Sequence, residues 1–168
     1  MNNTIEILWT GPFSSQEILK MNGPTDFGFY QLYGNHNIYG NNVLLYFGKA
    51  SKQNFATSIP QHDDWFGWED IQPEYYLGRI GGENQLNNQD WEEQIDYAEA
   101  KIIFECHPSW NSSGLNRADK KVKGQNVIIL NHGVRRSIPK IICDHFLVES
   151  ARNRGKWNVY STELFKKE

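Results

Sequence analysis

Two tyrosines carry the side chains of this sequence that point most directly to chemistry. Tyr30 and Tyr46 each stand two positions from a glycine, in the runs Gly28-Phe29-Tyr30 and Tyr46-Phe47-Gly48. Both runs predict β-strands, and residues two apart on a strand point to the same face of a sheet. Each phenol therefore shares its face with a residue that has no side chain, which leaves room around two hydroxyl groups.

Glu99 is a carboxylate in an apolar setting. The apolar spacing over residues 89–106 predicts a helix with Trp91, Ile95, Ala98 and Ile102 on one face. Isoleucines also stand within one turn of Glu99 on that helix, and a partly desolvated carboxylate is costly unless it is paired. The partner is either a basic side chain elsewhere in the fold or a metal ion.

Composition and cysteine usage indicate a folded protein of a reducing compartment. The chain has 168 residues, of which 39% are hydrophobic and 14% aromatic, typical of one globular domain with a real core. No apolar run is long enough to span a bilayer, and the start lacks the form of a signal peptide. Cys106 and Cys143 stand outside any CxxC spacing, as buried free thiols do. We expect a cytoplasmic protein that does not insert into membranes.

Charge is distributed unevenly along the chain. Residues 1–116 hold 5 Lys and Arg against 15 Asp and Glu, whereas residues 117–168 hold 12 against 5. A basic section beside an acidic body suggests a surface for a polyanion. The alternative is a solvated basic face that pairs with the acidic part of the same protein.

The expected elements describe an α+β chain folded as a single domain, 1–168. Residues 4–9 predict an edge strand, and short helices are expected after Ser14 and over residues 51–59, where Pro60 sets a limit. Residues 27–33 and 43–49 predict an antiparallel hairpin, because the loop between them is rich in Asn and Gly. Further strands are expected at residues 74–80 and 126–130 and at WNVY near the C-terminus, and the run IPKIICDHFLV is either another strand or a buried segment.

These pieces together resemble the GIY-YIG nuclease superfamily. GFY and YFG resemble the GIY and YIG strands for which that superfamily is named. Four further positions match its pattern in order: His62, Glu99, Pro108 and Asn111. The resemblance covers about residues 25–116, over half of the chain.

The resemblance implies a small three-stranded mixed or antiparallel sheet flanked by helices over residues 25–116. Residues 117–168 would then be a basic, β-containing C-terminal extension. It also implies metal-dependent hydrolysis of DNA phosphodiester bonds. The two phenols would face a groove kept open by Gly28 and Gly48, where a phosphate and its attacking water fit.

Site roles follow from the matching positions. Glu99 would be the sole protein ligand of one Mg²⁺ or Mn²⁺ ion, which accepts a single carboxylate together with waters and phosphate oxygens. Tyr30 would orient or deprotonate the attacking water with help from His62 or Tyr46. Lys49 would contact a phosphate. Asn111 is expected among the substrate-binding residues, and it would hold the site together by hydrogen bonds.

One residue of the family pattern is missing. The family carries an Arg on its first helix, four residues before the His, and the corresponding position here is Ser58. Arg79 on the third strand could supply the guanidinium from another direction, or could form an ordinary salt bridge at a strand end. A second possibility is that Lys49 or Lys52 substitutes with lower efficiency. In a third, cleavage has been lost and only binding remains, since one missing donor can lower the rate by about 10²–10³-fold.

The sequence thus predicts a metal-dependent DNA endonuclease with a GIY-YIG-like core. The alternative is a catalytically defective nucleic-acid-binding or protein-interaction module on the same fold. A basic surface for the phosphate backbone is expected in the C-terminal section. It would be centred on Lys120, Lys121, Lys123, Arg135, Arg136, Arg152 and Arg154.

Overall fold

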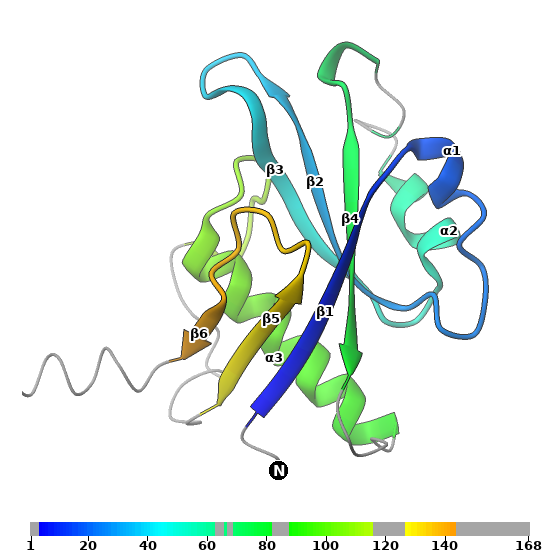
Figure 1. Ribbon diagram of the computed structural model, residues 1–168, viewed down its shortest axis with the longest axis vertical. Coiled ribbons are helices and arrows are strands. Elements are labelled where there is room, and N and C mark those ends of the chain that lie inside the picture. Colours follow the sequence, from blue (N-terminus) through cyan, green and yellow to red (C-terminus); the bar gives the residue numbers. More distant parts are fainter. Residues whose placement is uncertain (1–3, 63–65, 67–68, 82–87, 116–126, 144–168) are drawn as a thin grey trace, which may run out of the picture.

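The computed structural model describes residues 4–62, 66, 69–81, 88–115 and 127–143. Within these residues the strands form one six-stranded sheet of order β3-β2-β4-β1-β5-β6 (Figure 1). The strands are β1 (Thr4–Phe13), β2 (Gly28–His36), β3 (Gly40–Ala50), β4 (Glu74–Gly81), β5 (Ile128–Gly133) and β6 (Ile141–Cys143). The α-helices are α1 (Ser15–Ile18), α2 (Phe55–Ser58) and α3 (Asn88–Cys106), and single 3₁₀ turns cover Ile59–Gln61 and Glu69–Ile71. The β1–β5 pair is parallel and the other neighbouring pairs are antiparallel, so the sheet is mixed.

The prediction of a small three-stranded sheet flanked by helices is wrong. The expected hairpin and third strand are present as β3-β2-β4, but the sheet continues through β1, β5 and β6. The fold is therefore mostly sheet, with few helices. The strands β5 and β6 come from the region expected to form an extension, and they continue the same sheet instead.

Strand β1 is central rather than at an edge, contrary to the sequence prediction. Its burial alternates, with Ile5, Ile7 and Trp9 buried on one face. It pairs with β4 on one side and with β5 on the other, Thr4 lying opposite Ile128. Sequence alternation identified the strand, but not its two neighbours, both of which lie far along the chain.

Each face of the sheet carries its own apolar cluster. On one face, Phe29 and Phe47 pack with Trp9 and with Ile95 and Ile102 of α3, as the four-residue spacing of that helix predicted. On the other face, the cluster includes the neighbouring strand residues and the two short helices. Its buried members include Ile18, Tyr30, Leu32, Leu45, Phe55 and Ile59. Figure 1 shows α3 against one side of the sheet, with α1 and α2 well apart from α3.

The short helices are limited by their own sequence signals. Ser14 caps α1 in a reciprocal capping box with Glu17, as expected for a helix start at this position. Asn54 caps α2, and Pro60 then falls in the 3₁₀ turn that follows it. Among the helices of the described residues, none is long and apolar enough to cross a bilayer.

Candidate active site

The hairpin of β2 and β3 brings the two tyrosines together. Tyr30 lies opposite Gly48 and Leu32 lies opposite Tyr46, so the phenols are diagonal neighbours on one face. Their rings stack with centroids 5.9 Å apart and an interplanar angle of 24°. A β-carbon built on Gly48 would lie 2.7 Å from Cζ of Tyr30 and 2.8 Å from a ring carbon of Tyr46. Gly48 therefore makes room for the two rings themselves.

The expectation that the two glycines keep a phosphate groove open is accordingly wrong. Gly48 is covered by the phenols, and Gly28 allows a close approach of two strands. Gly28 has φ +140°, and a β-carbon there would lie 2.1 Å from the carbonyl oxygen of Gly78. Both glycines are required by packing within the sheet, and the open space lies elsewhere.

His62 reaches the Tyr30 hydroxyl from the turn that follows α2. Its Nε2 atom is 2.8 Å from the phenolic oxygen, and its ring centroid is 4.9 Å from that of Tyr46. Ser58, which the resemblance to the GIY-YIG pattern aligns with an Arg, also hydrogen-bonds the Tyr30 side chain. The Tyr30 hydroxyl thus has polar neighbours from a strand and from the α2 segment, in a site that is mostly buried.

Burial controls the ionisation of both phenols. Burial raises the pKa of Tyr30 well above its ordinary value, and the neighbouring Tyr46 and Glu99 raise it further. The pKa of Tyr46 is raised by burial and by Glu99. At neutral pH both tyrosines are therefore neutral, and Tyr30 can hold or relay a proton but does not act as a phenolate.

We expect the free energy of unfolding to fall as the pH rises above about 10. An unfolded tyrosine releases its proton near that pH, whereas buried Tyr30, Tyr33 and Tyr46 hold theirs to higher pH, because burial raises each pKa. The stabilisation is complete below the unfolded pKa and is lost as the pH passes through the folded values. Urea unfolding at a series of alkaline pH values measures this, alongside ultraviolet absorbance of phenolate. A free energy of unfolding that stays constant over this range would contradict the assignment.

Lys49, directly after the YFG run, meets two carboxylates of α3. Its Nζ atom is 2.7 Å from Oδ1 of Asp96 and 2.8 Å from Oε2 of Glu99. Burial raises the pKa of Glu99, and Lys49 only partly opposes this. Burial alone would lower the pKa of Lys49, but its hydrogen bonds to Asp96 and Glu99 outweigh that effect and raise it. Lys49 thus stays positively charged, and burial disfavours the charged form of Glu99 more than the pairing with Lys49 favours it.

Asp96 is a site residue that the sequence analysis missed. It stands three positions before Glu99 on α3, a spacing that places two side chains on neighbouring positions of one helix face. That spacing in the sequence could have identified Asp96 as a companion of Glu99. In the structure, both carboxylates face the strand that carries Lys49.

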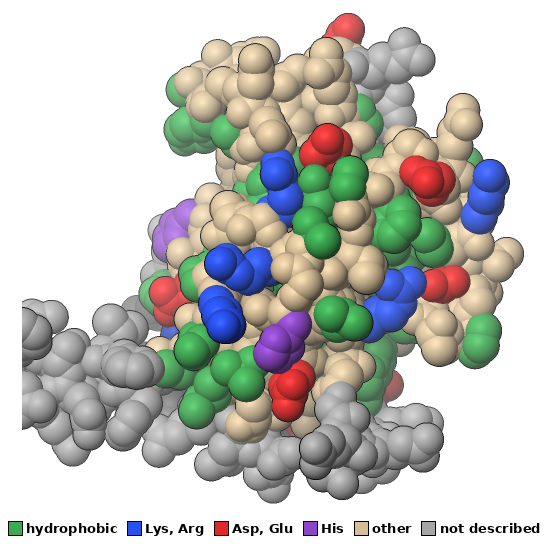
Figure 2. All heavy atoms as spheres, viewed as in Figure 1, with side chains coloured by type: hydrophobic (Ala, Val, Ile, Leu, Met, Phe, Trp, Pro, Cys, Tyr) green, Lys and Arg blue, Asp and Glu red, His purple; other side chains and the backbone are tan. Residues whose placement is uncertain are grey.

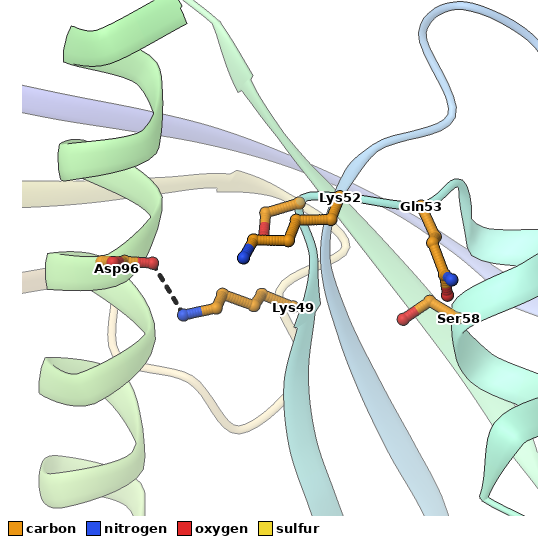
Figure 3. Close-up of a pocket in the computed structure, with 6 residues that line it drawn as sticks. Lys49, Lys52, Gln53, Ser58 and Asp96 are labelled. Carbon is orange, nitrogen blue, oxygen red and sulfur yellow. Dashed lines mark hydrogen bonds and ion pairs between the residues drawn. The ribbon is translucent and has the colours of Figure 1, made fainter.

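A cavity of about 450 Å³ opens beside this cluster (Figure 3). Its walls come from the end of β3 and the segment after it, from α2 and from α3. It is lined by Lys49, Ser51, Lys52, Gln53, Ser58 and Asp96. Figure 3 shows the Lys49 and Lys52 side chains extending into the same space, with Ser58 across from them. Ammonium and hydroxyl groups around one open cavity can receive a phosphate group.

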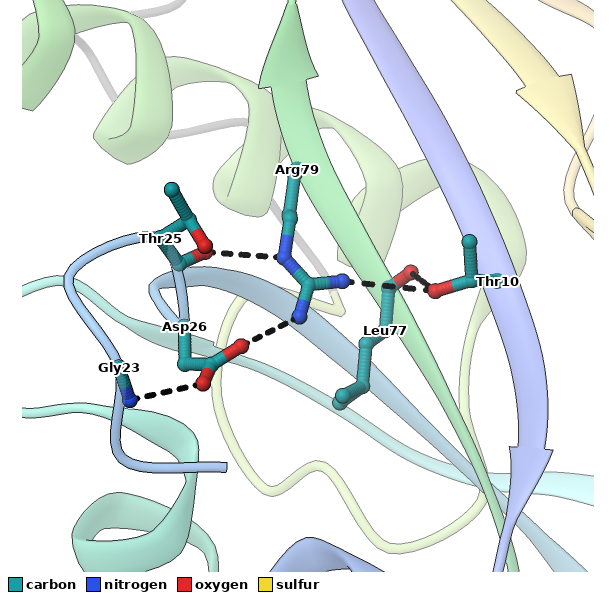
Figure 4. A network of polar contacts seen from close by, with 6 residues as sticks. All are labelled: Thr10, Gly23, Thr25, Asp26, Leu77 and Arg79. Atoms are coloured by element: carbon teal, nitrogen blue, oxygen red, sulfur yellow. Dashed lines mark hydrogen bonds and ion pairs between the residues drawn. The ribbon is translucent and has the colours of Figure 1, made fainter. Parts of the chain in front are cut away.

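Arg79 is held away from this cavity by the loop before β2 (Figure 4). Its Nη2 donates to Oδ1 of Asp26 at 2.7 Å, and its Nε donates to the carbonyl oxygen of Thr25 at 2.9 Å. The guanidinium also lies over the ring of Phe55, 5.3 Å from its centroid. Arg79 thus makes the strand-end salt bridge that was its alternative role.

Asn111 hydrogen-bonds the outer edge of β3. Its Oδ1 accepts from the backbone N–H of Phe47 at 3.0 Å, and its Nδ2 donates to the carbonyl oxygen of Phe47 at 2.9 Å. Just before it, the backbone N–H of Trp110 donates to the carbonyl oxygen of Leu45. The buried Asn111 therefore fixes the strand that carries Tyr46 and Lys49 by hydrogen bonds, as expected of it.

Two residues of the expected basic surface have other contacts. The guanidinium of Arg136 lies over the rings of Tyr33 and Tyr76, at 4.7 and 5.1 Å from their centroids, and it donates to Asn42. Arg135 donates to the carbonyl oxygen of Ile138. Lys121 and Lys123, like Lys120, Arg152 and Arg154, lie outside the described residues. On the face in Figure 2, basic side chains are interspersed with hydrophobic and acidic ones.

The structure therefore brings five of the predicted residues into one neighbourhood. They are Tyr30, Tyr46, Lys49, His62 and Glu99. They come from β2, β3, α3 and the turn after α2, which are far apart in the sequence. A scan of protein-family models and searches of curated proteins and of solved structures found no match for this chain.

Proposed function

We propose that the protein is a divalent-metal-dependent endonuclease of the GIY-YIG type that hydrolyses DNA phosphodiester bonds. The observation that carries the proposal is the convergence of the Tyr30–Tyr46–His62 group with Lys49 and Glu99, of which Lys49 also lines an open cavity. Hydroxyl, imidazole, ammonium and carboxylate groups together can position water, move a proton and neutralise a phosphate. The free thiols of Cys106 and Cys143 support a cytoplasmic location.

The carboxylates of α3 fit a hard divalent ion. Asp96 and Glu99 both reach one cationic nitrogen, that of Lys49, within 2.8 Å, so their oxygens can converge on a single positive charge. Mg²⁺ is bound by one or two carboxylates with several waters and phosphate oxygens, and needs no larger protein cage. Among the described residues, no group of three or more metal-ligating side chains is found. Mg²⁺ or Mn²⁺ held by Glu99, with Asp96 nearby, would stabilise the leaving oxygen as a Lewis acid.

The remaining roles belong to side chains of the chain itself. Tyr30, neutral at working pH, holds the attacking water through its hydroxyl and passes a proton on to His62, whose Nε2 lies 2.8 Å away. Imidazole is the side chain that most often transfers protons in catalysis. Lys49 has a flexible stem, so its ammonium group can leave the carboxylates and contact a phosphate oxygen. Lys52 lines the same cavity and adds a second positive charge.

A non-cleaving nucleic-acid-binding module is the second candidate. Two observations on arginines favour it. Ser58 stands where the GIY-YIG pattern has an Arg, and Arg79 is paired with Asp26. Lys49 and Lys52 are then the cations available to a phosphate in this cavity, and neither provides the bidentate contact of an arginine.

Nicking of supercoiled plasmid distinguishes the two candidates. We expect the wild-type chain to nick DNA with Mg²⁺ or Mn²⁺ and to stop when EDTA removes the metal. Intact plasmid at high protein concentration with either metal would overturn the endonuclease proposal. Salt-sensitive DNA binding without nicking would then support the binding module, because phosphate contacts weaken steeply as salt rises.

A further inference from the structure

A second cavity of about 450 Å³ adjoins the first and differs from it in chemistry. It is lined by Pro24, Thr25, Phe27, Ser51, Arg79, Ile80 and Trp91. Ser51 lines both cavities, so they meet at the end of β3. The first cavity has ammonium, hydroxyl, amide and carboxylate groups, whereas this one has two aromatic rings, an isoleucine and a guanidinium.

The wall of the second cavity is held in place by the Arg79 network (Figure 4). Arg79 on β4 bonds the Thr25 carbonyl oxygen and the Asp26 carboxylate, and the other Asp26 oxygen accepts from the N–H of Gly23 at 2.8 Å. The loop that supplies Pro24, Thr25 and Phe27 is therefore tied to the sheet. A pocket whose wall is fixed in this way is formed before a ligand arrives, as small-molecule sites commonly are.

One helix supplies a wall to each cavity. Trp91 of α3 lines the second cavity, and Asp96 of the same helix lines the first. Five residues of α-helix correspond to a rise of about 7.5 Å along the axis. A phosphate in the first cavity would thus have the aromatic-lined cavity next to it, on the other side of Ser51.

We propose that the second cavity binds a nucleobase that has left the base stack beside the phosphate held near Lys49. Aromatic rings such as those of Phe27 and Trp91 stack on the face of any base. The inference rests on the proposed function, because the base and the phosphate belong to the same substrate. It adds that the substrate presents an unstacked nucleotide at the site, as single-stranded, mismatched or distorted DNA does most readily.

The test is a titration of the isotope-labelled full chain, followed by NMR, with deoxynucleoside monophosphates, deoxynucleosides and inorganic phosphate. We expect the nucleotides to bind at least about 10-fold more tightly than inorganic phosphate, because stacking of one base adds that much affinity or more. The indole N–H of Trp91 should shift with nucleotide and with nucleoside, but not with phosphate alone. Trp91→Ala should reduce nucleotide affinity to that of phosphate.

A second variant removes the dependence on Trp91, which also packs against the core. Thr25→Trp fills the cavity from an exposed loop position and leaves the backbone contact with Arg79 in place. Gln16→Trp, at an exposed position of α1, is the matched control and should bind nucleotide like the wild type.

Nucleotides that bind no more tightly than phosphate would overturn the inference, as would nucleotide affinity unchanged in Trp91→Ala and Thr25→Trp. The plasmid assay separates this failure from that of the proposed function. Nicking without preferential nucleotide binding leaves the endonuclease proposal standing and removes the base site. If the wild-type chain binds nucleotide but nicks no DNA, and both variants lose that binding, the base site stands and the endonuclease proposal is removed.

Discussion

Glu99→Gln is expected to reduce metal-dependent DNA cleavage by at least about 10²–10³-fold, the loss typical of removing one stabilising group from a charged transition state. The amide keeps the shape of the side chain but cannot supply a carboxylate to Mg²⁺ or Mn²⁺. Lys49 keeps its other partner, Asp96, 2.7 Å away, so the substitution leaves no unpaired lysine. Initial nicking rates on supercoiled plasmid in the presence of either metal measure the effect.

The same substitution should not destabilise the fold. Burial raises the pKa of Glu99, so the folded chain holds this proton more tightly than the unfolded chain. The corresponding stabilisation is complete below the unfolded pKa and is lost as the pH rises through the folded pKa. Glutamine is uncharged at every pH and avoids this loss. Thermal unfolding at neutral pH should therefore give an equal or higher midpoint for Glu99→Gln.

Glu92→Gln is the matched control, because Glu92 is an exposed glutamate on the same helix. It should change neither the nicking rate nor the unfolding midpoint. Wild-type nicking in Glu99→Gln would show that Glu99 serves only as a partner of Lys49. A clear fall in the midpoint would show that the Lys49–Glu99 pair is mainly structural.

Trp9→Ala should lower the free energy of unfolding by about 3–5 kcal/mol, the usual effect of truncating a buried aromatic side chain. Trp9 is 1% exposed and packs against Phe29 and Phe47, with ring centroids 6.3 and 5.9 Å away. Its indole N–H also donates to Oδ1 of Asn131 at 2.9 Å. The truncation therefore leaves both a cavity and a buried acceptor without its donor.

Urea unfolding followed by circular dichroism measures this loss. Leu8→Ala is the control, because Leu8 is the neighbour of Trp9 on β1 and is 54% exposed. It should change the free energy of unfolding by no more than about 0.5 kcal/mol, as surface substitutions do. Equal effects for the two variants would mean that the Trp9 face of β1 is not part of the core.

Local patterns in the sequence predicted the parts of the fold that depend on local physics. The turn-rich loop between residues 33 and 43 indicated the β2–β3 hairpin, and the apolar spacing from Trp91 to Ile102 indicated α3 and its buried face. The position of β1 was not predictable in this way. Its parallel partner begins at Ile128, and strand alternation carries no information about which strand lies alongside.

In the candidate site, too, local sequence patterns predicted some features and could not predict others. The two tyrosine–glycine runs and the buried-helix setting of Glu99 singled out residues that the fold brings together. The pairing of Arg79 with Asp26 joins β4 to a loop more than fifty positions earlier, and nothing near Arg79 in the sequence indicates it. The prediction that Gly48 leaves room for a phosphate was wrong for a related reason. The space beside Gly48 is filled by Tyr30 from the neighbouring strand β2, which local sequence does not indicate.

The hydrogen bonds that residues 109–111 form with the outer edge of β3 also affect how the protein behaves at high concentration. β3 ends the sheet on one side, and an exposed edge strand is a template for pairing with another chain. Here the backbone N–H groups of Ser109 and Trp110 and the amide of Asn111 take up hydrogen-bonding groups of β3 from Leu44 to Phe47. A second molecule approaching that stretch finds these groups already bonded, so strand addition and the aggregation that follows from it are blocked there.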